Sequence, residues 1–332
     1  MNQKYLLYMY LLKARTFIAL LIVIGFFSVM VPNFLTPSNL LIMTQHVAIT
    51  GLLAIGMTLV ILTGGIDLSV GAVAGICGMV AGALLTSGVP LWGGNTLFLN
   101  VPEVILAVAL FGVIIGLVNG AVITRLGVAP FICTLGMMYV ARGAALLFND
   151  GSTYANLVGL PALGNTGFAF LGSGTLLGIY LPIWLMVGFL LLGLYLTSKT
   201  PLGRYIYATG GNESAARLAG VPVVRTRIII FILSGLVSAA AGIILASRMT
   251  SGQPMTSLGY ELVVISACVL GGVSLKGGIG KISYVVAGVL ILGTVENAMN
   301  LLNISPFSQY VVRGLILLAA VIFDRYKQKH KA

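Results

Sequence analysis

Long apolar runs separated by short polar segments recur along the whole sequence. Ten of these runs are close to the length that a membrane-spanning helix requires, which is about 20 residues. They predict an all-α fold, a polytopic integral membrane bundle of about ten transmembrane helices. The predicted spans cover residues 16–31, 41–62, 68–88, 104–124, 128–148, 178–197, 228–247, 261–275, 283–302 and 309–323.

Basic residues are distributed unevenly among the connections between these runs. They collect after the fourth, sixth and eighth runs and in the tail 325–331, and Arg248 is the exception. Because Lys and Arg are retained on the cytoplasmic side, both termini and the connection 198–227 are expected to be cytoplasmic. The cations that indicate this orientation are Arg125, Lys199, Arg204, Arg217, Arg225, Arg227, Lys276 and Lys281.

The composition excludes a soluble globule. Of the 332 residues, 59% are hydrophobic and 8% are charged, whereas soluble domains carry about 25% charged residues. The net charge of +11 comes from helix ends and one loop rather than from a basic stripe with interleaved aromatics, so a nucleic-acid partner is not expected. The connections are too short for a separate domain, and residues 1–332 are expected to form one transmembrane domain.

The sequence lacks the residue patterns of enzymes and metal sites. It contains no phosphate-binding loop and no Gly-x-Ser-x-Gly segment. Cys77, Cys133 and Cys268 lie in apolar runs without metal-ligand spacing. His46 stands alone in its run and is more typical of a packing residue than of a proton relay. We expect neither catalysis nor a bound metal or cofactor in this chain.

A Gly-Gly segment follows the second run and indicates a break between two helices. Paired glycines can close a helix, and Asp67 or Ser69 can then accept hydrogen bonds from the first amides of the next helix. The segment is therefore either a capped hinge or a gate, and these interpretations are compatible. Its candidate residues, with those of a second Gly-Gly segment, are Gly64, Gly65, Asp67, Ser69, Gly271 and Gly272.

Two pairs of segments resemble each other in the same order along the chain. Residues 64–71 align with 271–278, and Leu-Gly-Val-Ala-Pro-Phe at 126–131 aligns with Leu-Asn-Ile-Ser-Pro-Phe at 302–307. These matches predict an internal repeat. The span count places both Gly-Gly segments on the same membrane face, which favours parallel repeats, although one misplaced span would make them inverted.

The connection 203–222 is more elaborate than a simple link between helices. Gly210-Gly211 is expected to break the chain, Asn212 can cap a short helix over 213–218, and Gly220 and Pro222 can end it. A short exposed helix is better explained as a docking element for a cytoplasmic partner. Its candidate residues are Gly210, Gly211, Asn212, Glu213, Ala216, Arg217 and Gly220.

Four motifs together resemble a known family of membrane proteins. They are Ile-Leu-Thr-Gly-Gly-Ile-Asp-Leu-Ser-Val-Gly, Pro-Phe-Ile-Cys-Thr-Leu-Gly-Met-Met-Tyr-Val-Ala-Arg-Gly, Gly-Arg-Tyr-Ile-Tyr-Ala-Thr-Gly-Gly-Asn-Glu and Val-Leu-Gly-Gly-Val-Ser-Leu-Lys-Gly-Gly, at 61–71, 130–143, 203–213 and 269–278. In this order they are similar to the ribose-type sugar permeases of bacterial ABC importers, the inner-membrane components of binding-protein-dependent transport. The resemblance covers about residues 16–325.

The resemblance implies a multi-pass permease of the bacterial inner membrane that moves a small sugar or sugar-like solute by alternating access. Its expected partners are a cytoplasmic ATP-binding-cassette ATPase, a second permease copy or paralogue, a periplasmic solute-binding protein and membrane lipid. ATP would be used by the partner ATPase. In this family, the part matching 211–220 is expected to enter the groove of the ATPase.

Polar residues within the apolar runs are candidates for the solute pathway. An uncharged polyhydroxylated solute needs amide and carboxylate partners together with apolar ring contacts, and Phe131 or Phe307 could supply the rings. Hydrogen bonding between helices explains the same polar residues equally well, since they must face protein or water. The candidates are Gln45, Asn119, Glu296, Asn297 and Asn300.

Two other classes of transporter remain as alternatives. A stand-alone ion-coupled carrier predicts ionisable pairs near the midplane, whereas Asp67, Glu103 and Glu261 lie at span ends. A passive channel predicts pore-lining rings and no elaborate cytoplasmic helix. Co-purification with an ATPase would distinguish the importer from both.

Overall fold

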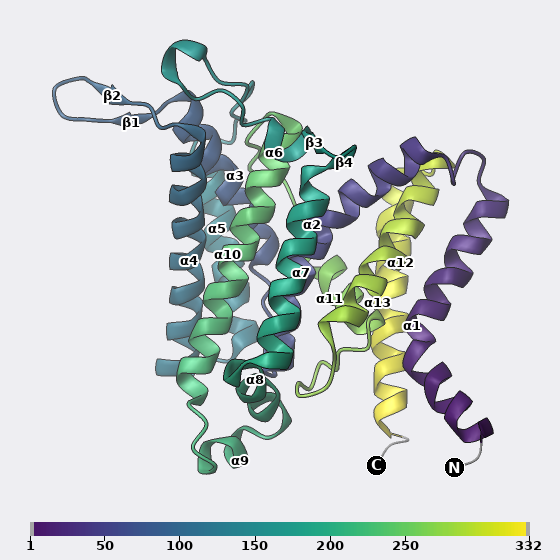
Figure 1. Cartoon of the computed structure of the whole chain (residues 1–332). Helices are drawn as coiled ribbons and strands as arrows, with labels where there is room; N and C mark the ends of the chain where they lie inside the picture. The colour runs from purple at the N-terminus through teal and green to yellow at the C-terminus, as the bar shows by residue number, and fades with distance from the viewer. Residues whose placement is uncertain (1–2, 330–332) are drawn as a thin grey trace.

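The computed structural model describes the backbone of residues 3–329 and the side chains of residues 16–322. Within these ranges the chain is a helical bundle with two short β-hairpins (Figure 1). The basic residues of both chain ends, Lys4, Lys13, Arg15 and the tail 325–331, lie outside the described side chains. The elements are α1 (Gln3–Met30), α2 (Pro37–Leu62), α3 (Val70–Thr86), β1 (Val89–Pro90), β2 (Thr96–Leu97), α4 (Val101–Arg125), α5 (Pro130–Leu147), a 3-10 turn (Pro161–Leu163), α6 (Phe170–Ser173), β3 (Thr175–Leu176), β4 (Ile179–Tyr180), α7 (Leu181–Lys199), α8 (Pro201–Gly211), α9 (Glu213–Leu218), α10 (Val223–Met249), α11 (Tyr260–Leu270), α12 (Ile282–Leu301) and α13 (Pro306–Lys329).

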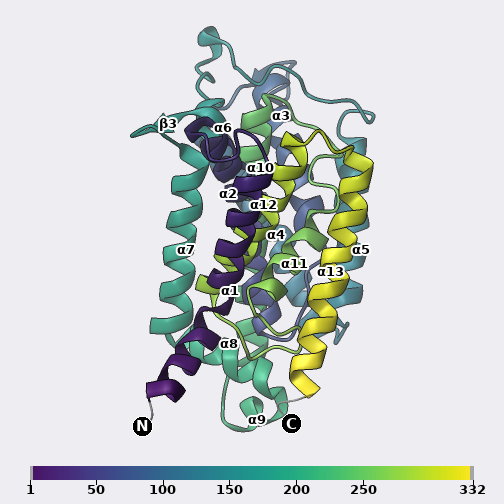
Figure 2. The same cartoon turned by 90° about the vertical axis from the view of Figure 1, so that its right-hand side faces the viewer.

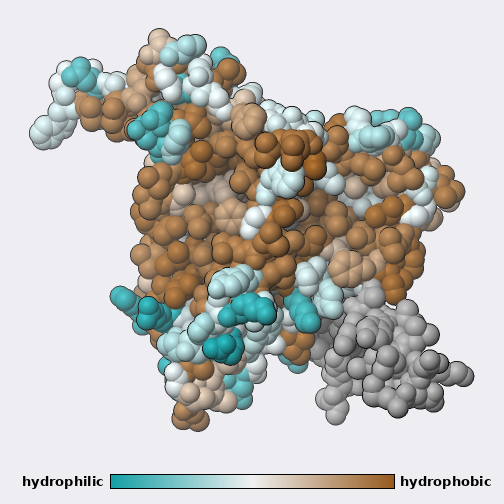
Figure 3. Space-filling model, viewed as in Figure 1, coloured by the Kyte–Doolittle hydropathy of each residue, from teal (hydrophilic) through white to brown (hydrophobic). Residues whose placement is uncertain are grey.

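Each of the ten predicted apolar runs coincides with a helix. Six of these helices, α2, α4, α5, α7, α10 and α12, are long and apolar enough to cross a membrane, and four shorter apolar segments lie in α1, α3, α11 and α13. On the face shown in Figure 3, apolar residues form a band across the middle of the molecule and polar residues gather toward its two ends. The chain is therefore a polytopic helical membrane protein.

The two ends of the bundle carry different structures. The hairpins β1–β2 and β3–β4 lie at one end, which we call the hairpin end, and α8 and α9 lie at the other, which we call the α9 end (Figures 1 and 2). The first described residues of α1 and the last of α13 also lie at the α9 end (Figure 1). An antiparallel bridge between Tyr154 and Gly252 joins two connections at the hairpin end.

Helices α2 and α10 form the centre of the bundle. In both helices most residues are buried, and α2 packs against α7, α10, α11 and α12. The small residues of α10 pack inside the protein, where a Cβ on Gly235 would overlap the backbone of Gly112 on α4. This close approach follows from the small side chains along α10, which allow helix backbones to contact each other.

Both Gly-Gly segments end a helix with the same backbone geometry. Gly64 and Gly272 have φ angles of 81° and 83°, the left-handed conformation in which glycine avoids a Cβ penalty. In each turn the next residue donates to a carbonyl five positions earlier, Gly65 N to Val60 O at 3.2 Å and Val273 N to Cys268 O at 3.0 Å. These are Schellman motifs. The equivalent of Gly64 is thus Gly272, one position from the sequence alignment, and α11 ends at Leu270 rather than continuing to 275.

The second pair of similar segments also shares its local geometry but not its location. Gly127 and Asn303 have φ angles of 68° and 52°, and Pro130 and Pro306 begin the following helices. The turn before α5 lies at the α9 end, whereas the turn before α13 lies at the hairpin end (Figure 1). Gly64 in the first Gly-Gly turn, by contrast, lies against Lys276 and Gly277, in the connection that follows the second Gly-Gly turn. The two pairs therefore do not support one simple parallel repeat.

Candidate functional site

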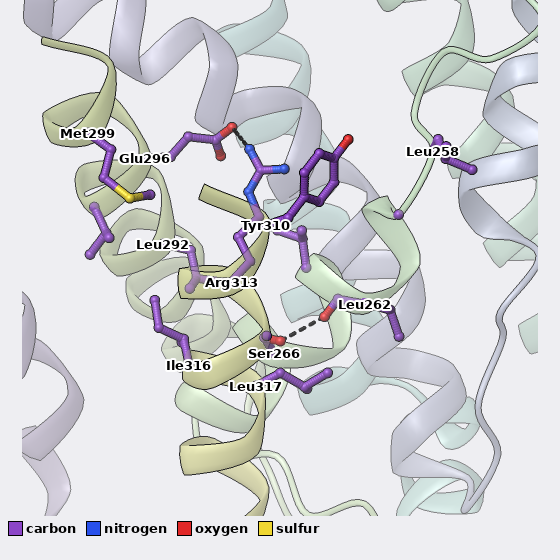
Figure 4. Close-up of a pocket in the computed structure, with 14 residues that line it drawn as sticks. Leu258, Leu262, Ser266, Leu292, Glu296, Met299, Tyr310, Arg313, Ile316 and Leu317 are labelled. Carbon is purple, nitrogen blue, oxygen red and sulfur yellow. Dashed lines mark hydrogen bonds and ion pairs between the residues drawn. The ribbon is translucent and has the colours of Figure 1, made fainter. Parts of the chain in front are cut away.

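A largely apolar pocket lies between α11, α12 and α13, with a charged pair on one wall (Figure 4). Glu296 and Arg313 point toward each other and form an ion pair, and the Tyr310 ring centroid lies 5.5 Å from the Arg313 guanidinium carbon. Leu292, Ile316 and Leu317 line the apolar part. An ionisable pair between apolar helices is costly and marks a candidate functional position.

A more polar pocket of about 300 Å³ lies on the other side of Glu296, between α2, α11 and α12. Glu296, Leu292 and Val263 contribute to both pockets. Asn39 and Asn297 bridge α2 and α12 through reciprocal amide hydrogen bonds of 2.9 and 3.0 Å. The pocket also contains His46, Thr50, Tyr260 and Asn300. Glu296 is therefore a shared wall between a polar and an apolar cavity.

The structure brings together three of the five residues predicted to line a solute pathway. Glu296, Asn297 and Asn300 line the polar pocket, and Asn300 accepts a 2.9 Å hydrogen bond from Gln309. Gln45 instead donates to the Gly172 carbonyl at 2.7 Å, and Asn119 donates to Ser69 Oγ at 3.1 Å. Both amides are buried and hold helices together.

The predicted aromatic contacts lie elsewhere. Phe131 and Phe307 are 51% and 82% exposed and line neither pocket, and the ring beside the charged pair is that of Tyr310. His46 is exposed rather than packed in the core, and its ring contacts the Arg248 guanidinium. Arg313 could have been identified as a candidate from the sequence, because a cation inside an apolar run is unusual.

Asp67 forms a buried polar network at the break between α2 and α3. Its Oδ1 accepts from Ser69 N at 3.0 Å and Ser69 Oγ at 2.5 Å, and its Oδ2 accepts from Ser234 Oγ of α10 at 2.8 Å. Asn119 of α4 donates to the same Ser69 hydroxyl. The Asp67 side chain therefore links α3, α4 and α10.

This network differs from the predicted helix cap. Ser69 is the N-cap residue of α3, but its side chain makes no capping hydrogen bond. Asp67 bonds to Ser69 itself rather than to amides inside α3. Its carboxylate thus fixes the turn between the helices by connecting it to α10, and its 3% exposure places it inside the protein rather than along an open passage.

The connection 198–227 forms two helices at the α9 end. The predicted cap at Asn212 is present, since Ala215 N donates to Asn212 Oδ1 at 3.0 Å. Gly210 and Gly211 do not break the chain before this cap but belong to α8, and the backbone becomes extended at Asn212, with a φ of −159°. Helix α9 is closed by Ala219 and Gly220, and Gly220 has a φ of 81°.

Charged contacts hold α9 against the start of α10. Glu213 accepts from Arg217 at 2.9 Å and from Arg227 at 2.7 Å. Partial burial would raise the pKa of Glu213, but the two arginines, Arg227 first, outweigh it and lower the pKa below its ordinary value. Arg217 and Leu218 are exposed, whereas Ala216 is buried, with 5% of its surface exposed.

Comparison with known proteins places the chain among membrane transport subunits. The family described as "Branched-chain amino acid transport system / permease component" matches residues 39–321. The L-arabinose transport system permease protein AraH of Escherichia coli (strain K12) is 56% identical over 304 residues, which is 92% of this chain and 88% of that protein. The Ribose import permease protein RbsC of Bacillus subtilis (strain 168) is 44% identical over 319 residues, 95% of this chain and 93% of that protein. No solved structure matches the chain.

Proposed function

The chain belongs to the family of branched-chain amino acid transport system permease components, and we propose that it carries a pentose, L-arabinose in particular, across the bacterial inner membrane. It is a permease subunit of an ATP-binding-cassette importer, not a stand-alone carrier. The sugar is inferred from the relatives named for L-arabinose and ribose, which cover nearly the whole chain. Both sugars are uncharged five-carbon aldoses with several hydroxyl groups.

The single observation that supports a sugar pathway is the position of Glu296 between the two pockets. A pentose presents hydroxyl groups that donate and accept, and it has an apolar C–H face. Glu296 and the amides of Asn297 and Asn300 can bond the hydroxyls, while Arg313 donates and the Tyr310 ring offers an apolar surface. Such a combination of apolar wall and few convergent polar groups is typical of small-molecule sites.

The orientation follows from the cations. Arg125, Lys199, Arg217, Arg225 and Arg227 belong to elements of the α9 end, which therefore faces the cytoplasm under the positive-inside rule. The ten apolar helices then cross the membrane ten times, and the described ends of α1 and α13 are cytoplasmic. The hairpin end faces the periplasm and receives the solute-binding protein.

A cytoplasmic ATPase docks on α9 and supplies the energy. The exposed Arg217 and Leu218, together with the open position Gly211, form the surface available to this partner. ATP is bound and hydrolysed by the partner, and its motion reaches the membrane through α8 and α9. The cavity then alternates between the two sides, because binding of ATP favours one of two conformations.

A second permease copy and lipid cover the exposed apolar helix faces. Ile132, Tyr139 and Val140 on α5 and Leu315 and Leu318 on α13 are each more than half exposed. Side chains of this kind belong against lipid or another permease.

The shared geometry of the two Gly-Gly turns supports an internal repeat of the helix-turn-helix unit around each of them.

The proposal is tested by transport in cells that lack their own pentose importers. The chain is expressed with the ATPase and the periplasmic binding protein of its importer, and uptake of labelled L-arabinose, D-ribose and leucine is measured. We expect saturable pentose uptake that needs all three components and persists when a protonophore removes the proton gradient but cellular ATP is maintained. The proposal would be contradicted if leucine but neither pentose were taken up, or if a pentose were taken up without the ATPase.

A further inference from the structure

Four glycines from three separate motifs meet at the α9 end of the bundle. Gly64 lies in the turn after α2, Gly210 lies in the last turn of α8, and Gly277 and Gly278 lie in the connection between α11 and α12. We call this group the glycine junction. Its members are more than 60 residues apart along the chain, except for the adjacent pair, so the contacts depend on the fold.

At Gly210, the backbone of α8 packs directly on the end of α2. A Cβ at this position would overlap the Leu62 carbonyl oxygen and would lie 2.6 Å from Gly278 N. Both neighbours are backbone atoms, which cannot be relieved by a side-chain rotation. Only glycine fits at this position of α8 without moving α2 or the α11–α12 connection.

The α11–α12 connection completes the junction. A Cβ on Gly277 would lie 2.8 Å from Gly64 N and 2.9 Å from Gly210 O, and Gly278 N donates to Leu62 O at 3.0 Å. The Tyr207 hydroxyl on α8 also donates to Gly280 O at 2.8 Å. Helix α8 thus contacts both the end of α2 and the connection that follows the second Gly-Gly turn.

We propose that the glycine junction is the contact through which α8 positions both Gly-Gly turns during transport, and that Gly210 is a positioning residue rather than part of the ATPase surface. The inference rests on the proposed function, because it presumes that α9 receives motion from an ATPase. A displacement of α8 acts on the end of α2 and on the α11–α12 connection together, since backbone contacts leave no compressible side chain between them. Helices α2, α11 and α12 line the polar pocket, so this displacement changes the pocket that contains Glu296.

Two glycines outside the connection 198–227 provide matched controls. Gly188 lies inside helix α7, and a Cβ there meets nothing within 4 Å. Gly127 has a φ of 68°, in the same left-handed region as the 88° of Gly277, and its Cβ would also meet nothing within 4 Å. The comparison of Gly210→Ala with Gly188→Ala separates junction contacts from helix propensity, and the comparison of Gly277→Ala with Gly127→Ala separates them from backbone strain.

The test measures coupling in the complete importer, reconstituted with its ATPase and binding protein in liposomes. L-Arabinose uptake and ATP hydrolysis are recorded in the same preparation, and the amount of assembled complex is determined by gel filtration. We expect Gly188→Ala and Gly127→Ala to keep the wild-type ratio of sugar moved to ATP hydrolysed. Gly210→Ala and Gly277→Ala should lower this ratio by roughly tenfold or more, within the range of measured coupling effects, while the complex still assembles and hydrolyses ATP.

An unchanged ratio in Gly210→Ala and Gly277→Ala would overturn the inference. It would equally be overturned if these two variants were lost from the membrane while their controls assembled, because the junction would then serve folding alone. Absence of ATP-driven pentose uptake in the wild-type importer would instead reject the proposed function. The two failures are therefore distinguishable.

Discussion

The carboxylate of Asp67, in the turn after α2, accepts a hydrogen bond from the Ser234 hydroxyl of α10 at 2.8 Å. Its other oxygen accepts from the amide and hydroxyl of Ser69, and Asn119 donates to that hydroxyl. One buried acid thus connects the first Gly-Gly turn to α10 directly and to α4 through Ser69. The cost of burying a carboxylate is offset here by three hydrogen bonds.

Replacement of Asp67 should reduce transport according to the acceptors that remain. Asp67→Ala leaves the Ser69 and Ser234 hydroxyls without their acceptor, which should lower the free energy of unfolding by about 1–3 kcal/mol. Asp67→Asn retains an amide oxygen as acceptor and should keep a substantial part of the transport activity. Asp67→Lys should abolish transport. Thermal unfolding and uptake per folded molecule measure both effects. Asp150→Asn is the control, because Asp150 is exposed and asparagine tolerates its φ of 46°. Equal uptake by all three Asp67 variants would show that the network has no role in transport.

The Glu296–Arg313 pair should affect the sugar concentration that half-saturates the importer. Glu296→Gln keeps the size of the side chain but removes the charge, so it weakens both the ion pair and the acceptor offered to sugar hydroxyls. We expect the half-saturating L-arabinose concentration to rise by about 10-fold or more, which corresponds to about 1.4 kcal/mol. Glu103→Gln, in the capping box of α4, should leave it unchanged. If Glu103→Gln raised the half-saturating concentration by the same factor, the proposed contact between Glu296 and the sugar would be contradicted.

The ion pairs of Glu213 should make the α9 surface insensitive to pH across the neutral range. Because the pKa of Glu213 is lowered in the folded protein, its contribution to stability is complete above the ordinary carboxyl pKa. It is lost only as the pH falls through the lowered value. Retention of the ATPase by immobilised permease should therefore stay constant from about pH 6 to pH 8, and Glu213→Gln should weaken it at every pH. If retention by the wild type declined steeply between these two pH values, another group would control the contact.

The orientation of the bundle can be tested by chemical labelling. Single cysteines at Asn95, in the β1–β2 hairpin, and at Ser198, near the end of α7, are introduced after Cys77, Cys133 and Cys268 are replaced. An impermeant thiol reagent added outside spheroplasts should label the Asn95 position, and the Ser198 position only after the membrane is opened. Labelling of both positions from outside would contradict the ten-span arrangement.

The sequence predicted the positions of the apolar helices, because a long apolar run has few alternatives to a helix in a membrane, and six of these helices are long enough to cross one. It missed α8, whose residues 201–211 include three glycines and few long apolar side chains. This helix begins with Pro201 after a Thr200 cap that bonds Gly203 N. Its last turn is also fixed by contacts with Leu62 and Gly278, which are distant in the sequence.

The candidate site was predicted only in part. Glu296, Asn297 and Asn300 are close in the sequence, which predicts that they lie close together on one helix. The structure places all three at one pocket. Gln45 and Asn119 have equally polar side chains, but their hydrogen-bond partners lie on other helices, which a pattern along one helix does not reveal. The same reason explains the glycine junction, since its members share no local spacing.

The central claim, that this permease moves a pentose with energy from a separate ATPase, is tested most directly in liposomes with purified components. Uptake of labelled L-arabinose is measured with the permease alone under an imposed proton or sodium gradient, and with the complete importer and ATP inside or outside. The account predicts no uptake by the permease alone and concentrative uptake only when ATP reaches the side that carries α9. Concentrative uptake by the permease alone, driven by an ion gradient, would contradict it.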